Sequence, residues 1–219
     1  MSRVKEIITD IETLSDWCVE IDPQKEGKLT QEIVLSLKST MREHGYEYLT
    51  APQIGYKKRM FCIRFGSNDY RTFINPVIEN NSGITMVRET CISIPETRFV
   101  IPRFGKVRVY YMTPLSKVEG STLVGRAAQV FQHCMDHLNG LLVSDIGLEI
   151  DDLFDQATDE EREEILKMYA ESLDLRQKEL AKEIEETPEI KQIDDAIDFI
   201  NSVKDGSTVL DVNSNTKDN

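Results

Sequence analysis

The feature that most constrains the fold is a helical stretch, from Gly125 to Leu138, that carries two histidines four residues apart. In an α-helix, residues at i and i+4 lie on one face one turn apart, so His133 and His137 can bind one metal ion. Two polar side chains at a surface would have the same spacing, so the pair alone leaves both interpretations open. The apolar positions of the stretch can face a core: Ala127, Ala128, Phe131 and Met135.

The chain before this helix has the two-residue alternation of β-strands. Arg59–Phe65 and Lys106–Met112 alternate, and Thr72–Ile78 is a shorter apolar run. Prolines and glycines between these runs indicate turns. Further upstream, apolar residues at helical spacing predict a helix that begins at Thr30 and ends at Gly45.

The acidic residues are concentrated at one end of the 219-residue chain. Residues 1–150 carry 18 Lys+Arg and 18 Asp+Glu, a net charge of 0, whereas residues 151–219 carry 8 and 21, a net charge of -13. Such a segment repels nucleic acid and anionic membranes. It is interpreted as an acidic helical appendage, with a docking surface for a basic protein partner as the alternative.

The acidic segment has the pattern of two helices. Thr158 and Glu161 have the spacing of a capping box, and Thr187-Pro188 starts a second helical pattern, which predicts an antiparallel hairpin. The predicted organisation is a metal-binding domain over 1–150, a helical extension over 151–210 and a disordered tail over 211–219.

Cysteine spacing and hydropathy limit the compartment. The four cysteines, at 18, 62, 91 and 134, lie far apart, which favours thiols or metal ligands over a disulfide framework. Cys18 and Cys62 are expected in the core. No apolar run is long enough to cross a membrane, and the first residues have no signal-peptide pattern. We expect a cytoplasmic protein with no membrane association; an organellar or viral origin remains open.

Three segments together resemble one protein family. They read QHCMDHLNG over 132–140, ETCIS over 89–93, running on to Arg103, and LTAPQIG over 49–55. They are similar to the Q-H-E-x-D-H-L-x-G, E-G-C-L-S and G-x-G-L-A-A-P-Q segments of peptide deformylases, in the same order. The resemblance covers about residues 4–150. It implies an α+β fold in which antiparallel strands surround a central metal-binding helix, with the acidic hairpin appended.

The resemblance also implies a site. Cys91, His133 and His137 would bind one divalent metal ion, Fe²⁺ by family precedent with Zn²⁺, Ni²⁺ or Co²⁺ as alternatives, and leave a fourth position for water. The expected reaction removes formyl from N-formylmethionyl peptides or nascent chains. Gln53 and the backbone N–H of Ile92 would stabilise the oxyanion.

Other residues are expected around this centre. Asp136 is expected to orient a ligand histidine. Glu89 and Arg98 are expected to form a buried pair that braces the cysteine loop. The substrate side is expected to include Tyr46, Tyr48, Leu49, Arg98, Arg126 and Val130.

The chain departs from the family pattern at Cys134, where the family has the glutamate that acts as general base. Losing a positioned acid–base group lowers a rate by about 10²–10⁴. Natural drift, an engineered change, and a fourth metal ligand that closes the site are the alternatives for this cysteine.

Further departures lie on the substrate side. Tyr46 and Tyr48 replace glycines and are expected to narrow the cleft. Thr90 replaces a glycine and would be strained at positive φ. Arg126 stands where the family often has an apolar residue.

Two functions therefore remain open. One is a formyl-removing metallohydrolase, and the other is a catalytically inactive metal-binding scaffold that acts in protein binding or assembly through its acidic extension. Whether the chain is an enzyme depends on Cys134 and on the openness of the cleft.

Overall fold

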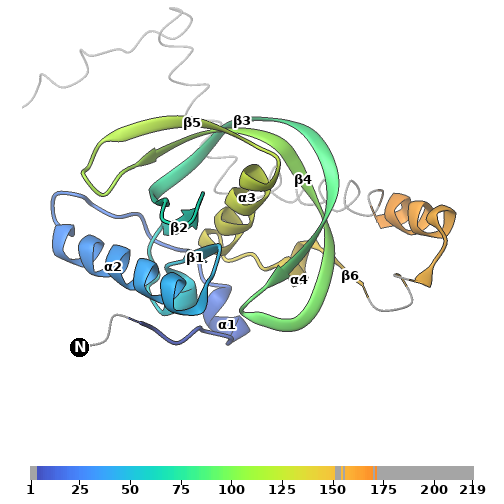
Figure 1. Ribbon diagram of the computed structural model, residues 1–219, viewed down its shortest axis with the longest axis horizontal. Helices are drawn as coiled ribbons and strands as arrows, with labels where there is room; N and C mark the ends of the chain where they lie inside the picture. Colours follow the sequence, from blue (N-terminus) through green and yellow to red (C-terminus); the bar gives the residue numbers. More distant parts are fainter. Residues whose placement is uncertain (1–3, 151–153, 155, 170, 172–219) are drawn as a thin grey trace, which may run out of the picture. The chain divides into compact units, whose positions relative to one another are not determined.

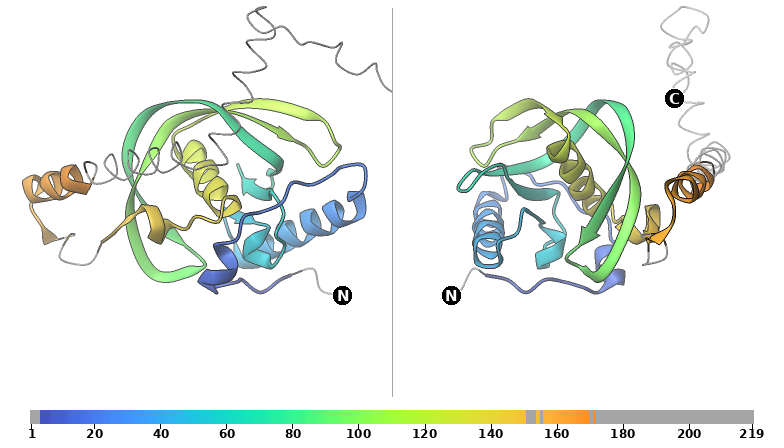
Figure 2. Two further views of the ribbon diagram at one scale, coloured as in Figure 1. Left: turned by 180° about the vertical axis from the view of Figure 1, so that it is seen from behind. Right: turned by 45° about the vertical axis from the view of Figure 1, so that its right-hand side comes forward.

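The computed structural model describes residues 4–150, 154, 156–169 and 171 (Figure 1). Contacts within the chain group Met1–Ala157 into one compact unit and Thr158–Asn219 into a second. In the first unit, the described strands form an antiparallel sheet of order β1-β2-β3-β4-β5, and β6 pairs with β4. Figures 1 and 2 show the long β3 and β4 curving around helix α3. The expected α+β fold with a central helix is confirmed.

The elements of this unit follow one another with short connections. In chain order they are α1 (Ile11–Leu14), α2 (Gly27–His44), β1 (Tyr48–Thr50), the 3₁₀ helix η1 (Pro52–Ile54), β2 (Met60–Arg64), β3 (Tyr70–Cys91), β4 (Ile94–Met112), β5 (Val118–Val124), α3 (Arg126–Leu138), α4 (Val143–Ile146) and β6 (Leu148–Ile150).

Strands β3 and β4 are much longer than their sequence patterns indicate. Thr72–Ile78 is only the first part of β3, which continues to Cys91 and pairs with β4 over most of its length. Residues 79–85 are exposed, so they have no buried face to produce alternation. Register shifts near Ile74 and Ile78 also interrupt the two-residue period. Both causes hide the strand from a pattern search.

Helix α2 begins earlier than predicted and ends as predicted. It starts at Gly27 instead of Thr30, whose hydroxyl donates to the Glu26 carbonyl within the first turn. It ends before Gly45, which has a φ of 73°. Glycine suits this left-handed cap because it has no Cβ.

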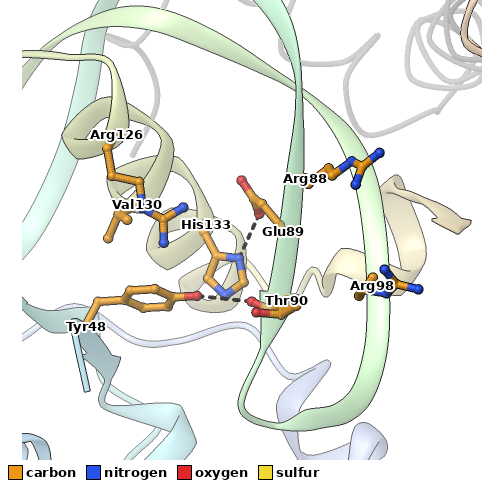
Figure 3. A pocket seen from close by; sticks show the side chains of 8 residues that line it. All are labelled: Tyr48, Arg88, Glu89, Thr90, Arg98, Arg126, Val130 and His133. Atoms are coloured by element: carbon orange, nitrogen blue, oxygen red, sulfur yellow. Dashed lines mark hydrogen bonds and ion pairs between the residues drawn. The ribbon is translucent and has the colours of Figure 1, made fainter. Parts of the chain in front are cut away.

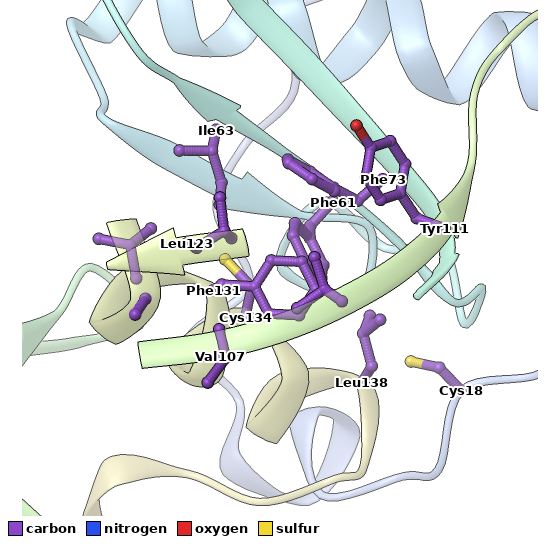
Figure 4. Close-up of a cluster of buried hydrophobic side chains, with 13 residues drawn as sticks. Cys18, Phe61, Ile63, Phe73, Val107, Tyr111, Leu123, Phe131, Cys134 and Leu138 are labelled. Carbon is purple, nitrogen blue, oxygen red and sulfur yellow. The ribbon is translucent and has the colours of Figure 1, made fainter. Parts of the chain in front are cut away.

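Helix α3 carries one side of the main core. Its range agrees with the predicted stretch, and Phe131 contacts Phe61 and Phe73 with ring centroids 5.0 and 5.3 Å apart. Figure 4 shows these rings with Cys134 beside them. Cys18 and Cys62 are buried in the core, as expected. The helix is therefore held by an aromatic cluster on the side that carries Cys134.

The second unit is described over part of its length. Residues 159–169 are helical, and Thr158 and Glu161 exchange the hydrogen bonds of a capping box, as predicted. The second helix of the predicted hairpin and the predicted disordered tail lie outside the described residues. None of the described helices is long and apolar enough to cross a membrane.

Gly140, after the end of α3, is predicted to tolerate no side chain. Its φ is 69°, and an added Cβ would lie 2.3 Å from the Ser15 carbonyl oxygen. We expect Gly140→Ala to lower the free energy of unfolding by about 2–5 kcal/mol, because the left-handed backbone costs about 1–2 and the overlap adds about 1–3 kcal/mol. Gly55→Ala is the control, since Gly55 has a φ of 86° but open space. Equal losses in urea unfolding would contradict the packing argument.

Candidate metal centre

Three buried side chains converge where the end of β3 meets α3. Cys91 is the last residue of β3, and His133 and His137 lie one turn apart on α3. One ligand atom from each lies within 4.8 Å of the other two, and the Cys91 sulfur is 3.2 Å from His137 Nε2. The curvature of β3 therefore brings the cysteine to the histidine face of the helix.

The chemistry of these atoms fits a divalent metal ion. His133 Nδ1 is 2.9 Å from a Glu89 oxygen, and the buried Nε2 on the other side of the ring has no hydrogen-bond partner. Burial raises the pKa of the Cys91 thiol, but hydrogen bonds and positive charge from His133 and His137 outweigh burial and lower the pKa to about 5. The thiolate is the form that binds metals. Three protein ligands with an open position are typical of a catalytic centre.

Arg103 organises a buried ionic network behind the cluster. Its guanidinium donates two hydrogen bonds of 2.8 Å to Glu89 and one of 2.6 Å to Asp136. Burial raises the pKa of Glu89, but the hydrogen bonds and positive charge of Arg103, and then of His133, outweigh burial and lower that pKa to about 2. Glu89 is thus an ionised acceptor that fixes the ring of His133.

This network corrects two expectations. Asp136 pairs with Arg103, and among the described residues no hydrogen bond joins it to His133 or His137. Glu89 pairs with Arg103 and not with Arg98, which lies opposite Ile150 of β6 in the sheet. The sequence analysis assigned no role to Arg103. The sequence did contain a signal, because Phe99, Ile101 and Arg103 alternate along the strand and so share one face of β4. All three are buried in the structure.

Gln53 faces the cluster from η1. Its Oε1 accepts hydrogen bonds from the backbone N–H and the hydroxyl of Thr50. Its Nε2 is therefore directed the other way, 3.7 Å from the Cys91 sulfur and 3.2 Å from the Ser93 hydroxyl. Thr50 and Ser93, which the sequence analysis did not single out, orient this amide. Ile92 is next to the cysteine and packs against a core cluster.

Cys134 lies apart from the ligand atoms. Its side chain is fully buried among Phe61, Phe131 and other apolar residues, and the described cluster of ligands does not include it. Burial raises the pKa of this thiol well above its usual range. The structure therefore does not support Cys134 as a fourth ligand, and a neutral thiol facing the core is not a general base.

A cavity of about 130 Å³ opens beside His133 (Figure 3). Of the expected substrate-side residues, four line it: Tyr48, Arg98, Arg126 and Val130. Leu49 and Tyr46 do not, contrary to expectation. Alternation along β1 turns Leu49 into the core, and Tyr46 stacks on the ring of His44. Arg88 also lines the cavity and had not been singled out.

The two cleft substitutions differ in their effect. Tyr48 reaches across the cavity, where its hydroxyl donates to the Thr90 carbonyl at 3.2 Å and its ring meets His133 edge-on at 5.0 Å. It narrows the cleft, as expected. Thr90 is in strand β3 and is not among the described residues with positive φ, so the expected strain is absent. A β-branched residue suits this extended backbone.

The antiparallel sheet around a central helix, with one cysteine and two histidines converging on it, is the architecture of a metallohydrolase domain. Residues 4–149 match the family model described as "Polypeptide deformylase". The chain therefore belongs to the polypeptide deformylase family, whose members are metal-dependent hydrolases that remove formyl groups.

Individual relatives agree with this assignment. The peptide deformylase of Thermotoga maritima is 33% identical over 129 residues, which cover 56% of this chain and 79% of that protein. Its crystal structure superposes with a TM-score of 0.60 at 30% identity, covering 65% and 97% of the two chains. The class I type b enzyme of Acinetobacter baumannii, with Met-Ala-Ser bound, has a TM-score of 0.61, covers 67% and 99%, and at 24% identity supports the fold alone.

The metal content of purified variants distinguishes residues that bind the metal from residues that only lie near it. We expect His133→Ala to lose the metal, and Glu89→Gln to bind it about 10–100-fold more weakly because His133 is no longer held by a charged acceptor. Cys134→Ala is the matched control and keeps the metal. Elemental analysis and competition with a chelator measure these effects. Loss of the metal from Cys134→Ala would instead indicate a four-ligand site.

Arg103→Met is expected to be strongly destabilising. It leaves Glu89 and Asp136 without their buried counter-charge, which costs about 3–5 kcal/mol. Lys25→Met removes one partner of the exposed Lys25–Asp22 pair and is expected to cost less than about 1 kcal/mol. Similar midpoints for the two variants in urea unfolding would show that the network contributes little.

Proposed function

We propose that the chain is a metal-dependent hydrolase that removes formyl from N-formylmethionyl peptides or nascent chains. The observation that carries this proposal is the convergence of Cys91, His133 and His137 with the amide of Gln53 beside a cavity. The tripeptide in the Acinetobacter baumannii structure is consistent with a peptide substrate.

The bound metal would lower the pKa of a water molecule and polarise the formyl carbonyl. Fe²⁺ is the ion we propose, and Zn²⁺ or Ni²⁺ also suits a donor set of one thiolate and two imidazoles. Cys91, His133 and His137 would hold the ion. A cytoplasmic location remains a prediction, supported by four free, buried cysteines.

The remaining steps depend on the chain's own groups. Glu89 holds the ring of His133 in one orientation, so that Nε2 faces the cluster. The Nε2–H of Gln53, oriented by Thr50, donates to the oxyanion that develops on the formyl oxygen, together with the N–H of Ile92. Val130 and Tyr48 would contact the side chain of the first residue.

Proton transfer to the leaving amine is the step for which the chain has no suitable side chain among those described. Burial keeps the proton bound to the Cys134 thiol, and Glu89 is an ion-paired carboxylate with a pKa of about 2, so neither group exchanges a proton near neutral pH. We therefore propose a hydrolase that turns over about 10²–10⁴-fold more slowly than one with a positioned glutamate.

Formate release from a formyl-Met peptide by metal-loaded protein tests this proposal. We expect Cys134→Glu to raise turnover by one or more orders of magnitude, about as much as a general base contributes. Cys134→Gln is the matched control, since it has a similar size but transfers no proton. Thermal unfolding of both variants checks that a polar residue in this core is tolerated. Equal turnover by the two would show that residue 134 is not the missing proton carrier.

A second candidate function follows from the burial of Cys134. If the natural protein and Cys134→Glu both bind the metal but release no formate, the chain would be a binding scaffold, which is the alternative given in the sequence analysis. A protein partner for the acidic extension would then be sought by co-purification with the full chain. That partner is a prediction from charge alone.

A further inference from the structure

Two adjacent residues, Glu47 just before β1 and Tyr48 at its start, reach across the cleft to different elements. Tyr48 donates its hydroxyl to the carbonyl of Thr90 at the end of β3, at 3.2 Å. Glu47 forms an ion pair of 2.7 Å with Arg126, the first residue of α3. Figure 3 shows the phenol of Tyr48 extended to Thr90, with Arg126 above it. Because β1 is the edge strand of the sheet, both contacts join that edge to the opposite wall of the cleft.

The cavity that these contacts leave is too small for the substrate. Its volume is about 130 Å³. A cavity of about 150 Å³ holds benzene, whereas a formylated methionyl unit has about ten non-hydrogen atoms against the six or so of benzene. The pocket is lined by His133 but not by Cys91 or His137, so a peptide that approaches all three ligands needs more room than this pocket provides.

We propose that Glu47 and Tyr48 form a clasp that opens to admit a peptide to the metal centre. The inference rests on the proposed function, because it assumes a peptide substrate for this cleft. It makes the two residues determinants of substrate size: a small metal ligand enters with the clasp shut, and a peptide enters only when it is open.

The strength of the contacts favours a gate over a fixed wall. The side chains of Arg126 and Glu47 are 55% and 38% exposed, and exposed ion pairs contribute little to stability. The hydroxyl of Tyr48 makes a single neutral hydrogen bond at the rim, and its ring meets that of His133 edge-on. A closed state held by these few contacts coexists with a minor open state, and apparent affinity falls in proportion to the open fraction.

Binding to the metal-loaded full chain tests the clasp without requiring turnover. The probes are the tripeptide Met-Ala-Ser and acetohydroxamate, a small metal ligand, each titrated by calorimetry. Tyr48→Phe keeps the ring and removes the hydroxyl, and Glu47→Gln removes the charge. We expect each to raise tripeptide affinity about three- to tenfold, the loss of one such contact, with a larger gain in the double variant. Acetohydroxamate affinity should change less than about twofold, because the small ligand does not need the open state.

Tyr46→Phe is the matched control, because Tyr46 lies two residues away and does not line the cavity. It should bind both probes as the natural chain does. Tripeptide affinities that are unchanged in Tyr48→Phe and Glu47→Gln would overturn the clasp. A gain seen only in Tyr48→Ala would also overturn it, since the ring would then be a fixed obstruction. Tighter tripeptide binding with no formate release from formyl-Met peptide would leave the clasp standing and defeat the proposed activity.

Discussion

The metal centre depends on the buried guanidinium of Arg103. One side chain from β4 forms ion pairs with Glu89 of β3 and Asp136 of α3, and Glu89 in turn holds the ring of His133. Burying these charges is costly unless each finds its counter-charge, so the three elements must meet in one arrangement. That arrangement brings Cys91, at the end of β3, to the histidine face of α3. The geometry of the candidate ligands therefore depends on this ionic network as well as on the apolar core.

The same helix presents a candidate metal ligand and a buried thiol at successive positions. His133 faces the cluster, and the next residue, Cys134, faces the aromatic core, where burial keeps its thiol neutral. The ligands, the network and Gln53 remain in place, whereas the proton carrier is missing and Tyr48 spans the cleft. The three residues that could hold a metal therefore lie together, and Cys134 and Tyr48 are two of the positions where the chain departs from the family segments.

Sequence reasoning predicted local features well and pairings poorly. The limits of α3, the glycine cap of α2 and the capping box at Thr158 follow from patterns within a few residues. The partner of Glu89 does not, because it depends on the register between β3 and β4. The exposed middle of β3 carries no alternation from which register can be read. The side of the sheet on which Leu49 lies depends likewise on how β1 pairs with β2, and this pairing turns Leu49 into the core instead of the cleft.

By itself, the sequence determined the family, the α+β class and the identity of the three candidate ligands, because spacing on one helix and short segments record these directly. Only the tertiary structure decided what those residues do for one another. It paired Glu89 with Arg103, buried Cys134 among apolar side chains and placed Tyr48 across the cleft. Such contacts join residues far apart in the chain, and their geometry follows from strand register and helix packing, which no local pattern specifies.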